Sequence, residues 1–301
     1  MSKISTPAME RLRRKNRYNV TGVSTPGKEA WKRLRKNKMA MVGLAIIVVL
    51  LLIALFANLL APYDYREQDY SAVLAKPDSA HPFGCDQLGR DLLSRCIFGT
   101  RYSLPIGILC VCIGLLTGGL LGLIAAYFGG TVDNVIMRLM DVIRAVPNVL
   151  LCIALVATFG NGMPQLIAAM SVGSVAGMVT SVRSAVFFIK NADYVESSKS
   201  IGVSNMMIML RHLLPNAIGM IVINAVGGIA GNILTVSTLS YIGVGLTSPT
   251  PEWGAILSDG KTYLSIAPHV ALFPGLCIAI TVVAFNLFGN GLRDALDPRL
   301  K

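Results

Sequence analysis

The residue types that most often carry chemistry are few in this chain and poorly placed for it. The histidines His81, His212 and His269 have no cysteine or carboxylate at the spacing of a metal site or a catalytic triad. Residues 22–28 have the spacing of a phosphate-binding loop, but Glu29 stands where a Ser or Thr would bind magnesium, and no apolar strand precedes the segment. The sequence therefore predicts no catalytic residue, no cofactor and no metal in this chain, and no way to use ATP by itself.

The six cysteines do not form the pattern of a disulfide framework. Cys85 and Cys96 share one predicted outer loop, where they either pair or remain free thiols. The spacing does not decide between the two, because connectivity cannot be read from sequence.

Composition places the chain in a membrane. Of its 301 residues 53% are hydrophobic and 14% are charged, whereas a soluble domain has about 25% charged residues. The net charge is +11, yet twelve of the 27 Lys and Arg residues lie in the first 38 positions, ahead of long apolar segments. This distribution indicates a basic cytoplasmic end on an apolar body, and it argues against a soluble enzyme or a nucleic-acid-binding protein.

Windows without charge predict an all-α integral membrane fold with six transmembrane helices. Each window is longer than the roughly 20 apolar residues that one crossing needs. The window 145–182 contains the helix-breaking cluster Gly-Asn-Gly-Met-Pro at 160–164, which divides it into two spans. The predicted spans lie near 40–60, 103–126, 136–159, 164–188, 217–245 and 268–289, with an outer loop at 61–102 and a cytoplasmic loop at 190–215. Residues 41–301 would form the transmembrane domain.

The segment before the first span divides into two parts. Residues 1–27 are predicted to be a basic cytoplasmic tail. Residues 28–40 are predicted to be a basic helix with Trp31 and Leu34 on one side, held at the membrane surface by anionic lipid. A merely solvated run of charges is the alternative.

The third span carries charges in its first turns. Asp141 lies three residues from both Arg138 and Arg144, so we expect these side chains to pair with one another and lower the cost of their insertion. Pro147 should kink the helix just beyond them.

Basic residues also predict the orientation. Six spans place both termini on one side of the membrane, and 21 of the 27 basic residues then fall on that side. Since cytoplasmic segments carry the excess of Lys and Arg, both termini are predicted to be cytoplasmic.

Glycines recur every four residues in two spans, Gly114, Gly118 and Gly122 in the second and Gly227 and Gly231 in the fifth. Small residues at this spacing let membrane helices approach closely. The stripes would serve packing within the bundle or contact with another subunit.

The cytoplasmic loop has the pattern of a two-helix elbow. Asp193 is expected to cap a helix with Glu196 three residues later, and Gly202 to end it. Ser204 would cap a second helix, and Pro215 would open the fifth span. Tyr194, Val195, Ser198 and Ile201 would share one side, offered to a groove of a partner or laid on the membrane surface.

The same loop resembles the EAA loop of ABC importer permeases. The matching residues are Glu196, Ser197, Ser198, Gly202, Leu214 and Pro215, with serines in place of both alanines and His212 at the isoleucine position.

Further segments are similar to the permeases of dipeptide, oligopeptide and nickel importers, and most closely to their C-type subunit. They are 84–95, with Cys85 for the usual threonine, 127–133, 249–254 and 291–299, preceded by Asn290 for the usual aspartate.

The resemblance implies the fold of a type I ABC importer permease in a prokaryotic cytoplasmic membrane. Its partners would be a second, usually different, permease, two cytosolic ATPases that bind ATP and magnesium, and an extracytoplasmic solute-binding protein. Residues 193–202 would be the coupling helix that contacts an ATPase, and the solute would be a di- or oligopeptide or a related small molecule. The outer segments 61–101 and 246–268 are candidates for docking the binding protein.

Two other functions remain as alternatives. A stand-alone secondary transporter or channel would need ionisable residues along the spans, and an intramembrane enzyme would need a nucleophile with a partnered histidine. Apart from Asp141, no Asp or Glu lies within a predicted span.

Overall fold

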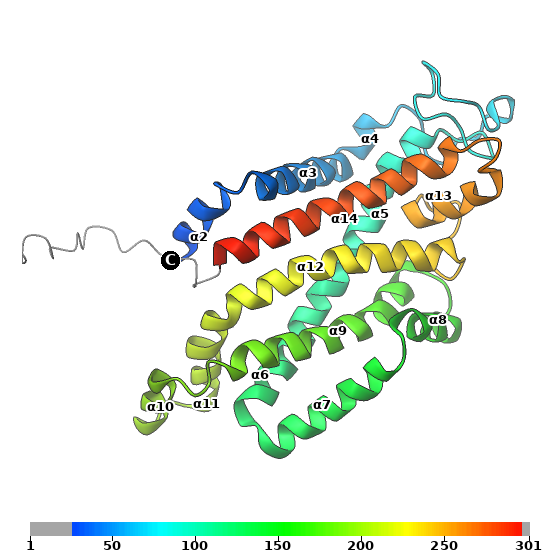
Figure 1. Ribbon diagram of the computed structural model, residues 1–301. Helices are drawn as coiled ribbons and strands as arrows, with labels where there is room; N and C mark the ends of the chain where they lie inside the picture. The colour runs from blue at the N-terminus through cyan, green and yellow to red at the C-terminus, as the bar shows by residue number, and fades with distance from the viewer. Residues whose placement is uncertain (1–25, 297–301) are drawn as a thin grey trace, which may run out of the picture.

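The computed structural model describes residues 26–296, and within them it contains helices, turns and loops without a named strand (Figure 1). Outside the described residues lie residues 1–25 of the predicted basic tail 1–27, most of the segment 22–28 and the end of the segment 291–299. Five helices are long and apolar enough to cross a membrane, and a bent pair makes up to six. The predicted all-α membrane architecture is confirmed at this level.

The long helices lie side by side along one axis, in the order α3, α14, α12, α9 and α7, and α5 crosses behind them (Figure 1). The bounds are α3 Lys38–Leu55, α4 Ala57–Leu60, α5 Leu92–Ile113, α6 Gly119–Phe128, α7 Gly130–Ala145, α8 Asn148–Phe159, α9 Met163–Phe187, α12 Leu214–Tyr241 and α14 His269–Leu296. A π-helical turn, η2 (Gly114–Gly118), joins α5 to α6 in one 37-residue helix.

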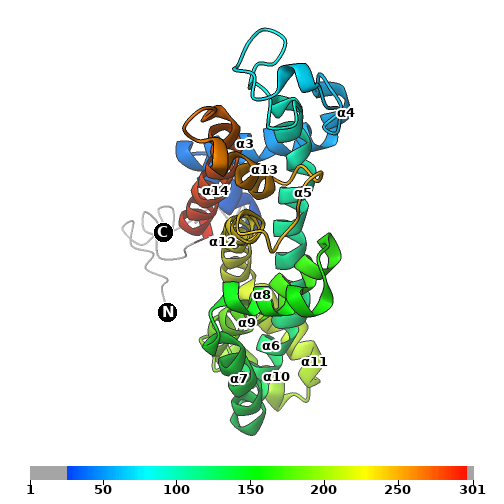
Figure 2. The ribbon, with the colours of Figure 1, turned by 90° about the vertical axis from the view of Figure 1, so that its right-hand side faces the viewer.

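Two groups of short segments occupy opposite ends of this bundle. Helices α10 (Asp193–Ser200) and α11 (Asn205–Met207) form an elbow at one end. The residues 61–91 and 242–268, with η1 (Tyr70–Ala72), α13 (Trp253–Gly260) and η4 (Lys261–Tyr263), lie at the other end and are called the loop lobe here (Figures 1 and 2).

The second span begins eleven residues earlier than predicted. The carboxylate of Asp91 accepts a hydrogen bond from the Ser94 amide at 2.7 Å and caps α5. It also contacts His81 Nδ1 at 2.9 Å. A capped helix can extend beyond the apolar window, so the expected loop 61–102 ends at residue 91.

The third span is broken instead of kinked. Helices α7 and α8 meet at an angle of 86°, with Val146 extended and Pro147 at the N-cap of α8. Proline disfavours helical geometry in the residue before it, which explains a complete stop. The predicted pairing on α7 is also wrong: among the described residues Asp141 makes no ion pair, and Arg144 donates to Thr180 Oγ1 at 3.0 Å.

The first glycine stripe packs within the chain. A Cβ atom on Gly118 or Gly122 would lie 2.5 Å from the carbonyl oxygen of Val175 or Val179, respectively, and one on Gly114 3.0 Å from that of Ser174. The backbone of α9 therefore touches η2 and α6 directly. Gly227 and Gly231 do not pack in this way, because nothing lies within 4 Å of their Cβ positions.

The basic helix before the first span is shorter than predicted. Helix α2 (Pro26–Leu34) ends before Asn37, whose side chain caps α3 by accepting from the Ala40 amide at 3.2 Å. Leu34 is buried against Ala40 and Ala295, while Trp31 is exposed. The two side chains thus do not share one membrane-facing side.

The loop lobe is held to the bundle by buried polar groups. Trp253 is fully buried and donates from Nε1 to the Cys96 carbonyl at 3.0 Å. The Glu252 carboxylate accepts from Ser103 Oγ at 3.0 Å and from the Ala255 amide at 2.9 Å.

A second buried cluster stabilises the segment that the sequence matched to the peptide permeases. Asp86 accepts hydrogen bonds from Arg95 Nη1 and, at 2.7 Å, from Arg90 Nε. Asp259 of α13 lies 3.3 Å from Arg90 Nη2. Two arginines and two aspartates balance their charges, so we assign the cluster a structural role.

We predict that Gly118→Ala destabilises the protein while the neighbouring Gly119→Ala does not. The new methyl group at 118 would meet backbone of α9, and overpacking costs about 1–3 kcal/mol; the Cβ position of Gly119 has nothing within 4 Å. Thermal unfolding of both variants in detergent measures the difference. Equal melting temperatures would contradict the close contact.

We also predict that the Cys85 thiol resists alkylation. It is fully buried, and burial, reinforced by the Asp91 and Asp86 carboxylates, raises its pKa to about 12. Because the raised pKa keeps the thiol protonated, iodoacetamide should not modify it at pH 8 or 9.5 in the folded protein. Unfolding in detergent should restore modification that increases between these pH values, as for a thiol with a pKa of about 8.5. Peptide mass spectrometry measures the extent of labelling.

Candidate functional site

The elbow between α9 and α12 forms as the sequence pattern indicates, with one difference at its start. Gly202 has a φ of +78° and ends α10, and its amide and that of Val203 donate to the carbonyls of Lys199 and Ser198. Ser204 caps α11 by accepting from the Met207 amide at 3.4 Å. Asp193 is not the N-cap, since Ala192 occupies that position without a side-chain bond and Asp193 is the first helical residue.

The two carboxylates of α10 are available to a partner. Asp193 and Glu196 are exposed, and neither side chain has a partner among the described residues. Both lie in the first turn, where negative charge interacts favourably with the helix dipole.

The predicted contact side of α10 is split in the structure. Val195 and Ser198 are buried and turn toward the bundle, where Val195 packs in a cluster with Ile208 and Leu213. Tyr194 and Ile201 are exposed. Side chains at 195 and 198 face inward because the elbow folds back on η3 (Ile208–Leu213), so they cannot contact a partner directly.

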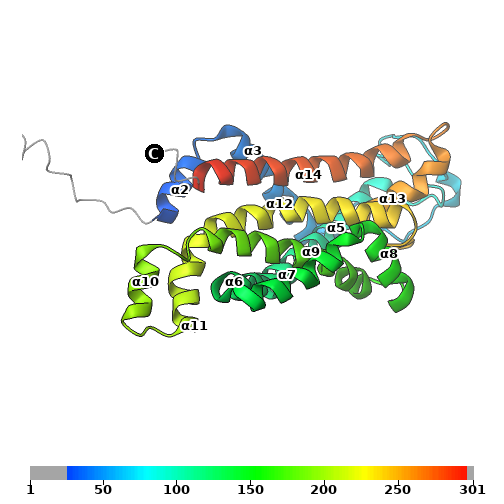
Figure 3. The same cartoon turned by 60° about the horizontal axis from the view of Figure 1, so that its bottom comes forward.

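Two methionines that the sequence reasoning missed complete the exposed tip. Met206 and Met207 are 62% and 50% exposed, beside an Ile201 that is 80% exposed. In Figure 3 the arms of the elbow project from the bundle. Adjacent methionines after a helix cap are a usable signal, because methionine is common at adaptable binding surfaces. We call Ile201, Met206 and Met207 the elbow tip.

Polar contacts tie the elbow to two membrane helices. Tyr127 at the end of α6 donates to Asn205 Oδ1 at 2.6 Å, and the Lys199 Nζ atom lies 5.3 Å from the centre of its ring. Asn216 of α12 donates to Tyr194 Oη at 3.4 Å. These contacts connect the elbow to α6 and α12.

Leu214 and Pro215 join the elbow to the fifth span without a helix stop. Residues 205–241 form one helix that contains the π-turn η3, which ends at Leu213. Pro215 follows as the second residue of α12, so its missing amide falls where the π-turn already interrupts the regular hydrogen-bond pattern.

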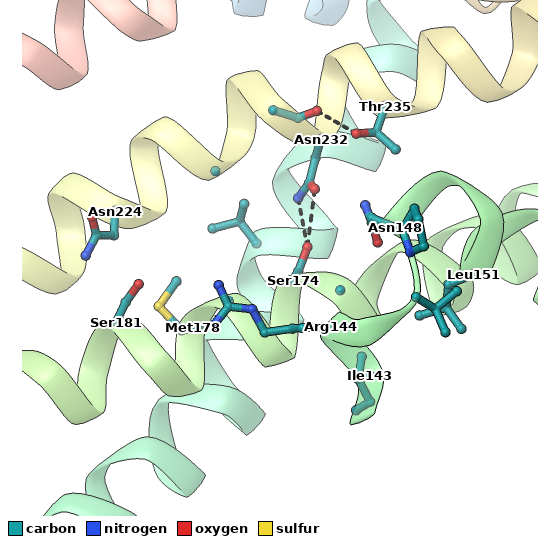
Figure 4. A pocket seen from close by; sticks show the side chains of 17 residues that line it. Ile143, Arg144, Asn148, Leu151, Ser174, Met178, Ser181, Asn224, Asn232 and Thr235 are labelled. Atoms are coloured by element: carbon teal, nitrogen blue, oxygen red, sulfur yellow. Dashed lines mark hydrogen bonds between the residues drawn. The ribbon is translucent and has the colours of Figure 1, made fainter. Parts of the chain in front are cut away.

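A polar cavity of about 570 Å³ lies where α7 breaks into α8, facing α9 and α12 (Figure 4). Its polar lining side chains are Arg144, Asn148, Ser174, Ser181, Asn224, Asn232 and Thr235. Asn232 donates to Ser174 Oγ at 3.1 Å and links α12 to α9. Gly231 also lines the cavity, which explains why its Cβ position is open.

No residue of this lining was predicted from the sequence to face a cavity. Asn224, Asn232 and Thr235 follow one face of an apolar helix at spacings of eight and three, and that pattern is a signal for a cavity within a span. Residues 26–296 contain no group of three or more His, Cys, Asp or Glu side chains that could hold a metal ion.

Two family models match separate parts of the chain. Residues 118–301 match the binding-protein-dependent transport system inner membrane component, and residues 25–77 match the N-terminal transmembrane domain of oligopeptide transport permease C.

Named relatives match over one longer stretch. The glutathione transport system permease protein GsiD of Pectobacterium atrosepticum is 43% identical over 280 residues, which are 93% of each chain. The protein of the same name from Escherichia coli O6:K15:H31 is 44% identical over 93% of this chain and 92% of its own.

Among solved structures, two inward-facing crystal forms of the MetNI methionine ABC transporter share the fold. The TM-scores are 0.55 and 0.56, and the sequence identities are 20% and 18%. Each superposition covers 68% of this chain, and it covers 96% and 98% of the two solved chains, respectively. The chain therefore belongs to the family of binding-protein-dependent transport system inner membrane components, as a permease subunit of an ABC importer.

Proposed function

We propose that this permease forms one half of the pathway by which an ATP-driven importer moves short peptides, with glutathione as the first solute to test. The family makes the chain a transport subunit and not an enzyme. The solute class is supported by relatives named for glutathione transport at 43% and 44% identity over 93% of the chain.

The elbow tip is the observation that carries the coupling role. Three apolar side chains stand in a polar loop with large exposed fractions, and the adjoining elbow is bonded to α6 and α12. An ATPase that covers the tip would gain about 1.5–3 kcal/mol for each large apolar side chain that it buries. Asp193, Glu196 and Ser197 would lie at the rim of this contact.

The remaining partners follow from the family to which the chain belongs. ATP and magnesium would be bound by two cytosolic ATPases, and a second, different permease would close the open side of the cavity. Gly227 and Gly231, with no neighbours at their Cβ positions, lie on the side of α12 that this second permease would approach. No role for nucleic acid is proposed.

The proposed orientation places the elbow, α2 and both termini in the cytoplasm, as the distribution of basic residues predicts. Anionic lipid would hold the basic residues of α2. The loop lobe would then face outward, where the segments 61–91 and 242–268 would dock the solute-binding protein through charges of both signs.

Transport would proceed by alternating access. Closure of the ATPases would move the elbow, and the contacts of Tyr127, Val195 and Asn216 would carry that motion into α6, α9 and α12. The cavity would open outward to receive solute and inward after hydrolysis.

We expect Ile201→Asp combined with Met206→Asp to lower ATPase binding at least about ten-fold, because two carboxylates would enter an apolar contact. The chain should still insert and fold, since both side chains are exposed. Copurification of the ATPases with the tagged permease measures the effect.

Tyr70→Asp is the control for that experiment, because it places a carboxylate on an exposed aromatic residue of the loop lobe, away from the elbow tip. It should leave ATPase binding unchanged. Equal copurification of all three proteins would remove the coupling role from the elbow tip.

A second expectation separates this function from that of a secondary transporter. The purified chain alone in liposomes should accumulate no glutathione under a proton or sodium gradient, whereas the assembly with ATPases, second permease and loaded binding protein should do so with ATP. Gradient-driven uptake by the single chain would overturn the proposed function.

A further inference from the structure

Arg144 is the one charged side chain among the described residues that line the membrane cavity. It lies in the last turn of α7, directly before the break at Pro147. An ionisable residue at membrane depth is costly unless it has a partner or water, so it marks a functional position by default.

The guanidinium group has unused hydrogen-bonding capacity. It is exposed to the cavity, and its one hydrogen bond to the described residues goes to Thr180 Oγ1 at 3.0 Å, although a guanidinium carries five N–H donors. The acids of α7 do not neutralise it. Within residues 26–296, Asp141 makes no ion pair, and Asp133 is bound by both Arg183 Nε and Nη2 at 2.5 Å.

The surroundings fit a small polar solute. The other polar groups of the lining are the amides of Asn148, Asn224 and Asn232 and the hydroxyls of Ser174, Ser181 and Thr235, without an Asp, Glu or aromatic side chain. Asn224 and Ser181 make no side-chain hydrogen bond to the described residues. Amide and hydroxyl groups can donate to and accept from a peptide backbone.

Helix geometry supports a water-filled site. Non-helical backbone is tolerated at membrane depth where it lines a cavity, and the break between α7 and α8 lies on the cavity wall. The volume of about 570 Å³ is within the range of about 300–1,000 Å³ for small-molecule sites.

We propose that Arg144 forms a carboxylate-binding subsite on the transport path, which receives the carboxylate of a short peptide while the amides and hydroxyls of α8, α9 and α12 bind its backbone. This inference rests on the proposed function. Arginine suits this role because its planar donors match a carboxylate in pairs. Contact with water keeps the binding moderate, so that the solute can leave.

The test compares two solutes in the complete assembly in proteoliposomes. Glutathione has two carboxylates, one on its glutamyl and one on its glycyl residue. Its glycyl amide keeps the first and lacks the second, which is the C-terminal carboxylate that the subsite would receive. With the binding protein saturated by either solute, the ratio of the two uptake rates is measured for the wild type and for Arg144→Gln. Any preference of the binding protein is common to both assemblies and cancels.

Arg144→Gln should lower this ratio about ten-fold or more, the usual effect of losing one hydrogen-bonded charge. Arg144→Lys should restore part of it. The matched control is Arg138→Gln, which removes the same charge from an exposed position of α7 outside the cavity and should leave the ratio unchanged. An unchanged ratio in Arg144→Gln, with uptake intact, would overturn the subsite.

A second measurement does not depend on which solute is carried. Ser181→Cys places a thiol in the cavity wall, and labelling of the unchanged chain is subtracted as background. The rate of a sulfonate-bearing methanethiosulfonate reagent is compared with that of the trimethylammonium reagent, each divided by its rate with a small free thiol. The normalised rate of the sulfonate reagent should be the higher one, and this preference should vanish in Arg144→Gln and persist in Arg144→Lys. S-methylglutathione, which has no thiol to consume the reagents, should slow the labelling only where residue 144 is positively charged.

The outcomes separate the two proposals. If the wild-type assembly carries neither solute, the proposed substrate class is wrong, and the labelling preference then decides whether Arg144 makes the cavity attractive to carboxylates. If transport is observed but labelling shows no dependence on charge at residue 144, the subsite is wrong while the proposed function stands.

Discussion

The backbone contact between the glycine stripe of η2 and α6 and the helix α9 is the interaction on which the functional parts of this permease depend. Gly118 allows the two helices to approach at Val175, and the next residues of α9, Gly177 and Met178, line the cavity. The same helix ends at Phe187, shortly before the elbow. Cavity and elbow are therefore attached to one tightly packed helix pair. In lipid, where apolar burial gives no drive between helices, such close packing supplies the rigidity.

Charged side chains have different surroundings in the loop lobe and in the cavity. In the loop lobe, Arg90 and Arg95 are buried with Asp86 and Asp259, and the cluster is balanced. In the cavity, Arg144 has one neutral acceptor and no acid partner. A balanced buried cluster holds structure together, whereas an arginine that faces a water-filled cavity is free to exchange water for a ligand. The contrast explains why the two arginines of the loop lobe have a structural role, whereas Arg144 is proposed to bind solute.

The sequence predicted the features that depend on local pattern. Apolar length located the spans, and Gly202 and Ser204 marked the elbow, because hydrophobic insertion and helix capping act over a few neighbouring residues. Features that need a second element were missed or misread. Val195 was expected to face a partner or the membrane surface, but η3 covers it. Gly227 was expected to pack within the bundle or against another subunit, and within this chain its Cβ position is open. Pro147 was expected only to kink the third span. The angle at a proline also depends on the neighbouring helices and on whether they leave a cavity beside it, which the local sequence does not show.

The position of Arg144 also bears on the proposed pairing with a different permease. In a symmetric dimer, an identical chain would present a second Arg144 to the same cavity, and two like charges that face one cavity disfavour one another. A short peptide carries an ammonium group as well as a carboxylate, and a cavity with two cationic walls would match only one of them. A different second permease can supply a neutral or acidic wall opposite Arg144, so that each half of the path contacts one end of the solute. The chemistry of a zwitterionic solute thus favours the heterodimer over the homodimer.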